Sequence, residues 1–292
     1  MSRVSAWIGA ARPKTLPASV GPVLLGTGAA AGIGKFEPVS FILCLLVAIS
    51  VQIAANLSND YSDGVRGTDD ENRVGPQRLT GAGIVAPAVV RRAAFVMYGL
   101  TAVFGLILTW WSGVWVLLPV GVLAFLASWF YVGGRHPYGY FPGIAEVMVF
   151  VFFGLVATCA TTYTQALVLS WRVILAAAGI GMLSCALLMT NNLRDRANDE
   201  RVGKDTLSVR LGDLRSRKML ELELTLACVA AVVALPTFLG KCVAACLAIV
   251  ALFVNLPVTR GASGMELFRV LRNIGLFTLL YGAAVGAGFL LP

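Results

Sequence analysis

Charged residues are scarce in this chain, and histidine is almost absent. Of its 292 residues only 13% are Asp, Glu, Lys or Arg, whereas a soluble domain carries about 25%. His136 is the single histidine and no two cysteines form a C-x-x-C pair, which excludes a zinc site of the usual Cys and His type. Hydrophobic residues make up 58% of the chain, the composition of a membrane protein.

Long apolar runs explain this composition. Each run is close to the ~20 residues that a membrane helix needs. Nine such segments are expected, at residues 15–33, 38–58, 85–110, 113–133, 141–161, 171–191, 219–238, 240–258 and 268–291. We therefore predict an all-α, polytopic membrane protein with nine transmembrane helices, forming a single domain over residues 1–292.

The net charge of +8 fits contact with anionic membrane lipid better than contact with nucleic acid. With a cytoplasmic N-terminus and nine spans, all Lys and Arg residues fall on the inside except Lys35, Arg172 and Lys241. This asymmetry follows the positive-inside rule and supports both the count and the orientation. We expect a multi-pass protein of a bacterial inner membrane, with no nucleic-acid partner.

Acidic residues gather in two cytoplasmic stretches, 56–84 and 191–218, each following a predicted span. In the first, Asn56, Asp60 and Asp63 recur at spacings of four and three, which places them on one helix face. Three oxygen-bearing side chains in one stripe suit Mg²⁺, which binds one or two carboxylates and completes its shell with water and substrate phosphate.

The second stretch repeats this pattern. Asn192, Asp195 and Asp199 form another oxygen-rich group at the end of the sixth predicted span. Acidic residues at helix ends are often simply solvated, but two groups on the same side of the membrane favour two Mg²⁺ ions held around one diphosphate. We assign catalytic roles to the four carboxylates, Asp60, Asp63, Asp195 and Asp199.

Basic residues are interleaved with both groups. They are Arg73, Arg78, Arg194 and Lys204, and we predict that they bind diphosphate oxygens. A separate turn, rich in Gly and Tyr, runs from Tyr131 to Tyr140. Its tyrosines could orient a phenolic substrate or form an interfacial aromatic belt. Glu146 lies inside an apolar segment, where an acid is a functional candidate by default.

These motifs resemble those of the UbiA superfamily of membrane prenyltransferases. Asn56-x-x-x-Asp60-x-x-Asp63 is similar to the first Asp-rich motif of the family, and Asn192-x-x-Asp195-x-x-x-Asp199 to the second. Within the superfamily, further matches point to the menaquinone branch, the 1,4-dihydroxy-2-naphthoate polyprenyltransferases. They include residues 11–17, Tyr131-x-Gly133-Gly134 and residues 203–212.

The resemblance implies a reaction and its partners. A polyprenyl diphosphate would donate its chain to 1,4-dihydroxy-2-naphthoate with loss of CO₂ and pyrophosphate, giving demethylmenaquinone with Mg²⁺ as cofactor. Arg12, Lys14, Tyr131, Tyr140 and Glu146 are weaker candidates for binding the acceptor. Three alternatives stay open: the same chemistry on another acceptor such as 4-hydroxybenzoate, a cation-coupled transporter, and a structural membrane subunit that binds a finished quinone.

Overall fold

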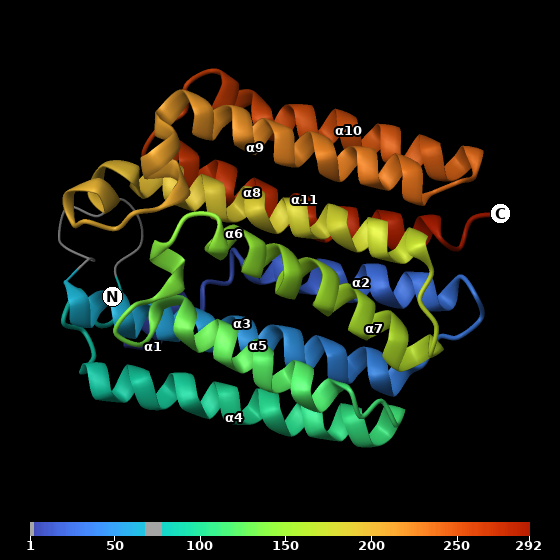
Figure 1. The fold of residues 1–292 in the computed structure, drawn as a ribbon, viewed down its shortest axis with the longest axis horizontal. Helices are drawn as coiled ribbons and strands as arrows, with labels where there is room; N and C mark the ends of the chain where they lie inside the picture. Colours follow the sequence, from blue (N-terminus) through green and yellow to red (C-terminus); the bar gives the residue numbers. More distant parts are fainter. Residues whose placement is uncertain (1–2, 68–77) are drawn as a thin grey trace.

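The computed structural model describes residues 3–67 and 78–292, and every regular element in these ranges is helical (Figure 1). Arg73 therefore lies outside the described residues. In chain order the elements are α1 (Arg3–Ala11), α2 (Leu16–Ala31), α3 (Pro38–Arg66), α4 (Pro87–Ser112), α5 (Leu117–Val132), η1 (Tyr138–Tyr140), α6 (Ile144–Val149), η2 (Phe150–Val156), α7 (Ala157–Ala166), α8 (Trp171–Arg201), α9 (Leu207–Ala234), α10 (Phe238–Thr259) and α11 (Met265–Gly288).

Local chemistry fixes several helix ends. Pro38 occupies the first turn of α3, and the Glu37 carboxylate accepts hydrogen bonds from the free backbone N–H groups of that turn. Ser170 and Thr206 cap α8 and α9 in the same way through their hydroxyl oxygens. At the other end of α3, Gly67 adopts a left-handed conformation (φ 70°) that stops the helix.

Each predicted apolar segment coincides with helix in the described part of the chain. Six helical stretches there are long and apolar enough to cross a membrane, namely α3, α4, α6 through α7, α8, α10 and α11. Helices α2 and α5 are apolar but shorter, and the last 18 residues of α9 still contain four charged side chains. The polytopic all-α fold is confirmed, whereas the count of nine spans and the side of the N-terminus stay predictions.

The polar stretches are more helical than expected. Residues 191–218 were expected to be a loop, but α8 continues to Arg201 and α9 begins at Leu207. Hydropathy could not show this, because a helix stays a helix after it leaves the apolar layer. Side-chain bonds along α8, such as that from the Arg194 guanidinium to Asn191 Oδ1 at 2.8 Å, support its polar end.

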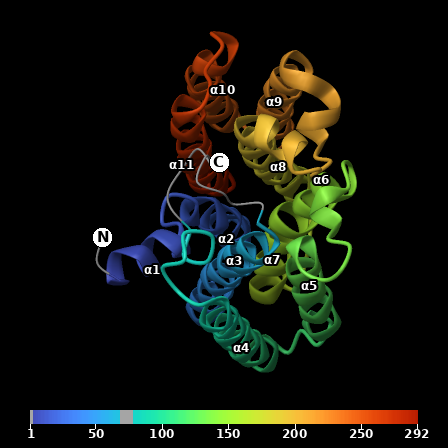
Figure 2. The same ribbon diagram turned by 90° about the vertical axis from the view of Figure 1, so that its left-hand side faces the viewer.

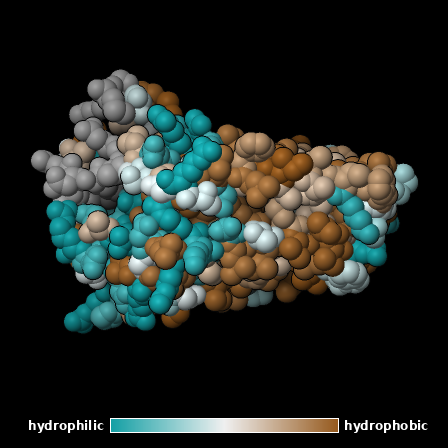
Figure 3. Space-filling view, turned by 90° about the horizontal axis from the view of Figure 1, so that it is seen from above, coloured by the Kyte–Doolittle hydropathy of each residue, from teal (hydrophilic) through white to brown (hydrophobic). Residues whose placement is uncertain are grey.

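The helices run along the long axis, and their connections gather at two ends (Figures 1 and 2). One end carries α1, the last turns of α3 and α8, and the connection 202–206. Figure 3 shows that hydrophilic residues concentrate at this end, while apolar side chains cover the middle of the molecule. Lys35, Arg172 and Lys241 lie in or next to connections at the opposite end. Both acidic motifs therefore reach the same, polar end.

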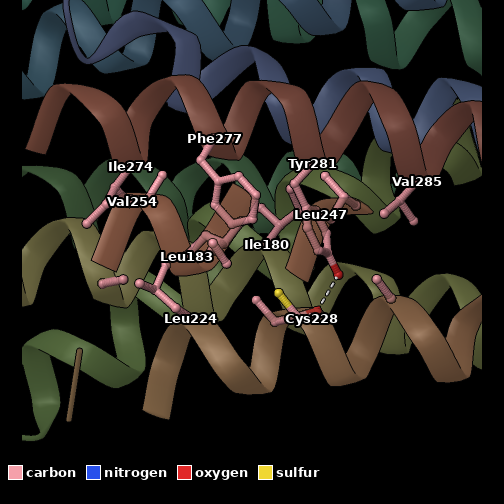
Figure 4. Packing of buried hydrophobic residues seen from close by; sticks show 14 of the residues in the cluster. Ile180, Leu183, Leu224, Cys228, Leu247, Val254, Ile274, Phe277, Tyr281 and Val285 are labelled. Atoms are coloured by element: carbon pink, nitrogen blue, oxygen red, sulfur yellow. Dashed lines mark hydrogen bonds between the residues drawn. The ribbon is translucent and has the colours of Figure 1, made fainter. Parts of the chain in front are cut away.

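Two kinds of packing hold the helices together. Glycines let α2 and α11 touch, since a Cβ on Gly28 would lie 2.4 Å from the carbonyl carbon of Gly286. The largest apolar core lies among α8, α9, α10 and α11 (Figure 4). There the Tyr281 hydroxyl donates a 3.0 Å hydrogen bond to the carbonyl oxygen of Ala227. This framework fixes α8 and α11, whose polar ends form part of the site.

Candidate functional site

Asn56, the first residue of the first motif, holds the N-terminal turn in place. Its amide nitrogen donates a 3.0 Å hydrogen bond to the carbonyl oxygen of Ala11, and its oxygen accepts one from Gln52. The turn that follows contains Arg12 with φ 51°, a left-handed conformation that costs free energy for a non-glycine residue. Asn56, predicted as a metal ligand, thus fastens the segment that carries Arg12 and Lys14.

Asp60, one turn further along α3, holds a second segment. It is fully buried, and its two carboxylate oxygens accept hydrogen bonds of 2.9 Å from the backbone nitrogens of Leu79 and Thr80. Gly64 lets this segment lie against the helix, because a Cβ there would be 2.5 Å from the Thr80 side chain. Asp60 therefore positions the turn that begins at Arg78.

Asp63, the third residue of the first motif, lies near the end of α3 and shares a charged partner with the second motif. Lys204 interacts with both: its Nζ lies 4.0 Å from Oδ1 of Asp199, and the carboxylate of Asp63 acts on it electrostatically. Burial lowers the pKa of Lys204, but the carboxylates of Asp63 and Asp199 outweigh this effect and raise the pKa above its ordinary value. The structure thus brings one carboxylate from each motif to the same ammonium group. We call Asp63, Asp199 and Lys204 the acid–lysine cluster.

Asp195 has a different neighbour. Arg194 binds it through two nitrogens, with Nε 2.8 Å from Oδ1 and Nη2 2.5 Å from Oδ2. The Arg194 side chain is 4% exposed, so this pair is held inside the protein. Asn192, beside it on α8, is also buried. The second motif therefore contributes one carboxylate to the acid–lysine cluster and one to an arginine.

A large cavity begins at the polar end and extends between the helices. Its volume is about 1270 Å³, more than the roughly 300–1000 Å³ of a pocket for one drug-sized ligand. It runs from Lys14 and Arg194 to Thr109 and Leu117 near the opposite end, and most of its wall is apolar. A cavity of this shape can take a polar head at one end and a long hydrocarbon chain along its length.

Cations concentrate where this cavity is polar. Its described lining includes no Asp or Glu but five basic residues: Arg12, Lys14, Arg78, Arg194 and Arg272. Asn56, Asn59 and Asn191 lie among them. A concave surface with this charge favours anionic ligands.

The tyrosine-rich turn connects the cavity to the acid–lysine cluster. Tyr131 lines the cavity, and Lys204 Nζ lies 5.1 Å from the ring centre of Tyr140. Arg66 holds the turn by donating to the carbonyl oxygens of Val132 and Gly134. Glu146 caps the start of α6, where its Oε2 accepts a 2.7 Å hydrogen bond from Gly143 N. Tyr131 and Tyr138 of this turn line the cavity, whereas Arg66, Tyr140 and Glu146 do not.

Sequence reasoning missed the contribution of α11. Phe268 lines the cavity, with Lys14 Nζ 4.9 Å and the Arg194 guanidinium 6.0 Å from its ring centre. Arg272 lines the same cavity one turn along. No local motif marks these residues. The only signal was a basic, aromatic start to an apolar segment.

The acid–lysine cluster fits a hard divalent cation that also binds substrate. No group of three His, Cys, Asp or Glu residues within ranges 3–67 and 78–292 could hold a metal by itself. However, Asp199 Oδ2 is buried and has no hydrogen-bond partner among the described residues. Mg²⁺ commonly takes one or two carboxylates and fills its shell with water and phosphate oxygens, which this arrangement permits.

Solved structures share this fold. A UbiA homolog from Archaeoglobus fulgidus bound to GPP and Mg²⁺ matches with TM-score 0.70 over 97% of this chain and 99% of that one, at 13% identity. The apo structure of a UbiA homolog from Aeropyrum pernix matches with TM-score 0.71, over 91% and 96% of the two chains, at 12% identity. At these identities the likeness shows the fold alone.

The sequence profile of the UbiA prenyltransferase family matches residues 19–266, so this chain belongs to that family. Its relatives include a protein of Mycobacterium tuberculosis that is 44% identical over 98% of this chain and 97% of its own length. Another, from Escherichia coli, is 38% identical over 75% of this chain and 72% of its own length. Both relatives are named 1,4-dihydroxy-2-naphthoate octaprenyltransferase.

Proposed function

We propose that this protein transfers a polyprenyl chain from polyprenyl diphosphate to 1,4-dihydroxy-2-naphthoate. The acceptor loses CO₂ and the donor loses pyrophosphate, which gives demethylmenaquinone in its reduced, quinol form. The observation that carries the proposal is the position of the acid–lysine cluster beside a cation-lined cavity of about 1270 Å³. The acceptor is proposed from the names of relatives up to 44% identical.

Two anions must bind for this reaction, and the chain offers cations for both. We assign the diphosphate to Lys204, Arg78 and Arg194, which lie in or beside the polar end of the cavity, with Arg73, outside the described residues, as a further candidate. Cationic side chains there stabilise the negative charge that develops on the leaving pyrophosphate. The apolar wall of the cavity binds the prenyl chain and excludes water, which protects an allylic cation from hydrolysis.

The metal would be held by Asp63 and Asp199, with Asn192 as a neighbouring oxygen donor. When bound, Mg²⁺ would neutralise diphosphate charge and polarise the bond to the leaving group. Asn56 and Asp60 remain predicted site residues, and in the proposal they act by holding the segments of Lys14 and Arg78. We place the site at the cytoplasmic face of a bacterial inner membrane.

A purified-enzyme assay tests the proposal. Detergent-solubilised protein is mixed with a prenyl diphosphate and either 1,4-dihydroxy-2-naphthoate or 4-hydroxybenzoate, with Mg²⁺ or with EDTA. The proposal predicts prenylated, decarboxylated naphthalenediol by mass spectrometry, only with Mg²⁺. Prenylation of 4-hydroxybenzoate alone would change the acceptor and keep the enzyme class. If neither acceptor gave a product, the enzyme assignment would be rejected.

A further inference from the structure

Aromatic and cationic groups meet on one face of α11 at the polar end of the cavity. Phe268 and Arg272 are four residues apart and both line the cavity, so they share a face of the helix. The Lys14 segment packs on this face, because a Cβ on Gly275 would lie 3.3 Å from the carbonyl oxygen of Lys14. The Lys14 side chain then reaches back so that Nζ lies 4.9 Å from the Phe268 ring centre.

The cations of the site differ in their partners. Arg194, 6.0 Å from the ring centre, is neutralised by Asp195, and Lys204 lies beside Asp199. Lys14 makes no ion pair with any residue in the described ranges, and Arg272 bonds only to the neutral side chain of Asn273 among them. Lys14 and Arg272 therefore retain positive charge at the cavity, next to an aromatic ring.

We infer that Phe268, Lys14 and Arg272 form the subsite that binds the carboxylated ring of the acceptor, an inference that rests on the proposed function. A flat ring with a carboxylate needs an aromatic surface to stack on and a cation near its edge. This face of α11 supplies both. The acid–lysine cluster suits a metal-bound diphosphate instead. Its two carboxylates would repel the carboxylate of the acceptor, which carries no metal.

Holding Lys14 over Phe268 also sets its position before the acceptor arrives. A lysine side chain loses conformational entropy when it is fixed. Because the cation–π contact already restricts Lys14, less entropy is lost when the acceptor binds. Asn56 contributes from the other side by fastening the Ala11 carbonyl oxygen at 3.0 Å. The acceptor subsite thus joins the connection between α1 and α2 to α11, with support from α3.

Kinetics of three variants test the inference. Lys14→Gln and Phe268→Leu should each raise KM for 1,4-dihydroxy-2-naphthoate about tenfold, with KM for the prenyl diphosphate within about twofold of wild type. Arg269→Gln is the matched control, since Arg269 is exposed on the same helix and does not line the cavity. An unchanged KM for the acceptor in Lys14→Gln and Phe268→Leu, or a rise confined to the diphosphate, would overturn the inference.

A pair of competitive inhibitors isolates the carboxylate. 1-Hydroxy-2-naphthoate and 1-naphthol differ only by that group, and wild type should bind the acid about tenfold more tightly. In Lys14→Gln this preference should fall to about threefold or less, while Phe268→Leu should weaken both inhibitors. A preference for the acid that survives in Lys14→Gln would remove Lys14 from the subsite.

Different results would reject the proposed function and the acceptor subsite. If wild type makes no prenylated naphthalenediol, the proposed function fails before any variant is measured. If wild type turns over and the variants keep the KM of wild type for the acceptor, only the subsite fails. Phe268→Tyr, which keeps the ring, should restore acceptor binding, so a loss of folding in Phe268→Leu would not decide the question.

Discussion

The ammonium group of Lys204 lies 4.0 Å from Oδ1 of Asp199, the last carboxylate of the second motif. Asp63, from the first motif, acts on the same ammonium and helps to raise its pKa. These carboxylates are more than 130 positions apart in the chain, on α3 and α8, yet they share one counter-charge. The acid–lysine cluster is therefore the point at which the two motifs become one site.

Removing the charge of Lys204 should make the protein depend on metal for stability. Lys204→Gln leaves two carboxylates facing each other without a cation, which should cost about 2 kcal/mol of folding free energy. Mg²⁺ should then raise the melting temperature of this variant more than that of wild type. Thermal unfolding with and without Mg²⁺ measures this, and equal metal-induced shifts in both proteins would contradict it.

The raised pKa of Lys204 also predicts a pH response. Because its folded pKa lies above the unfolded value, the stability it contributes is fully present below the unfolded pKa and is lost as pH rises through the folded pKa. This window lies above 10.5, the ordinary pKa of a lysine side chain. The difference in free energy of unfolding between wild type and Lys204→Gln should therefore show no step from titration of Lys204 between about pH 6 and 9. A step in this range, measured by thermal unfolding and persisting in an Asp63→Asn/Asp199→Asn background in which the neighbouring carboxylates cannot titrate, would mean that Lys204 titrates there.

Asp60 should matter more for stability than Asp63. Asp60→Ala leaves the buried N–H groups of Leu79 and Thr80 without an acceptor, which should cost about 2–4 kcal/mol. Activity should fall with it, because the segment carrying Arg78 is released. Asp63→Asn should abolish transfer and lower the melting temperature less than Asp60→Ala does. Melting temperatures of the purified variants test this difference. An Asp60→Ala protein as stable as wild type would contradict the role of Asp60 in holding the segment that begins at Arg78.

Asn56 should act on the acceptor through the N-terminal turn. Asn56→Ala removes the bond to the Ala11 carbonyl oxygen, so the left-handed Arg12 should relax and Lys14 should leave its position. We expect KM for the acceptor to rise about fivefold, with a smaller effect on the diphosphate. Ser50→Ala, which removes a hydroxyl on the same helix away from this turn, serves as control. Steady-state kinetics with each substrate varied would show an unequal effect.

Much of the fold could be predicted from sequence, because apolar runs record burial in lipid directly. The nine segments from residue 15 to residue 291 all coincide with helix in the described ranges. The polar ends of α3 and α8 could not be delimited in this way, since hydropathy falls while the helix continues. The π-helix at Phe150–Val156 also leaves no mark in an apolar run.

The sequence predicted which residues gather at the site, but not which partner each of them binds. Helical spacing placed Asn56, Asp60 and Asp63 on one face, and all three are buried in the structure. Spacing could not reveal their partners, because those of Asn56 and Asp60 include backbone groups 45 and 19 residues away. Phe268 was missed for the same reason, since its significance depends on Lys14 and Arg194 from other helices.

The most direct test of the shared site is a binding cycle with geranyl S-thiolodiphosphate, an unreactive donor analogue, titrated calorimetrically with and without Mg²⁺. Wild type and the control Asp205→Asn, at an exposed residue paired with Arg210, should show strong Mg²⁺-dependent tightening. Asp63→Asn and Asp199→Asn should each lose most of it, and the double variant should lose little more. Two results would contradict a site shared by the two motifs. One is a loss of Mg²⁺-dependent affinity in the double variant equal to the sum of the two single losses, and the other is a wild-type gain in affinity with Mg²⁺ in either single variant.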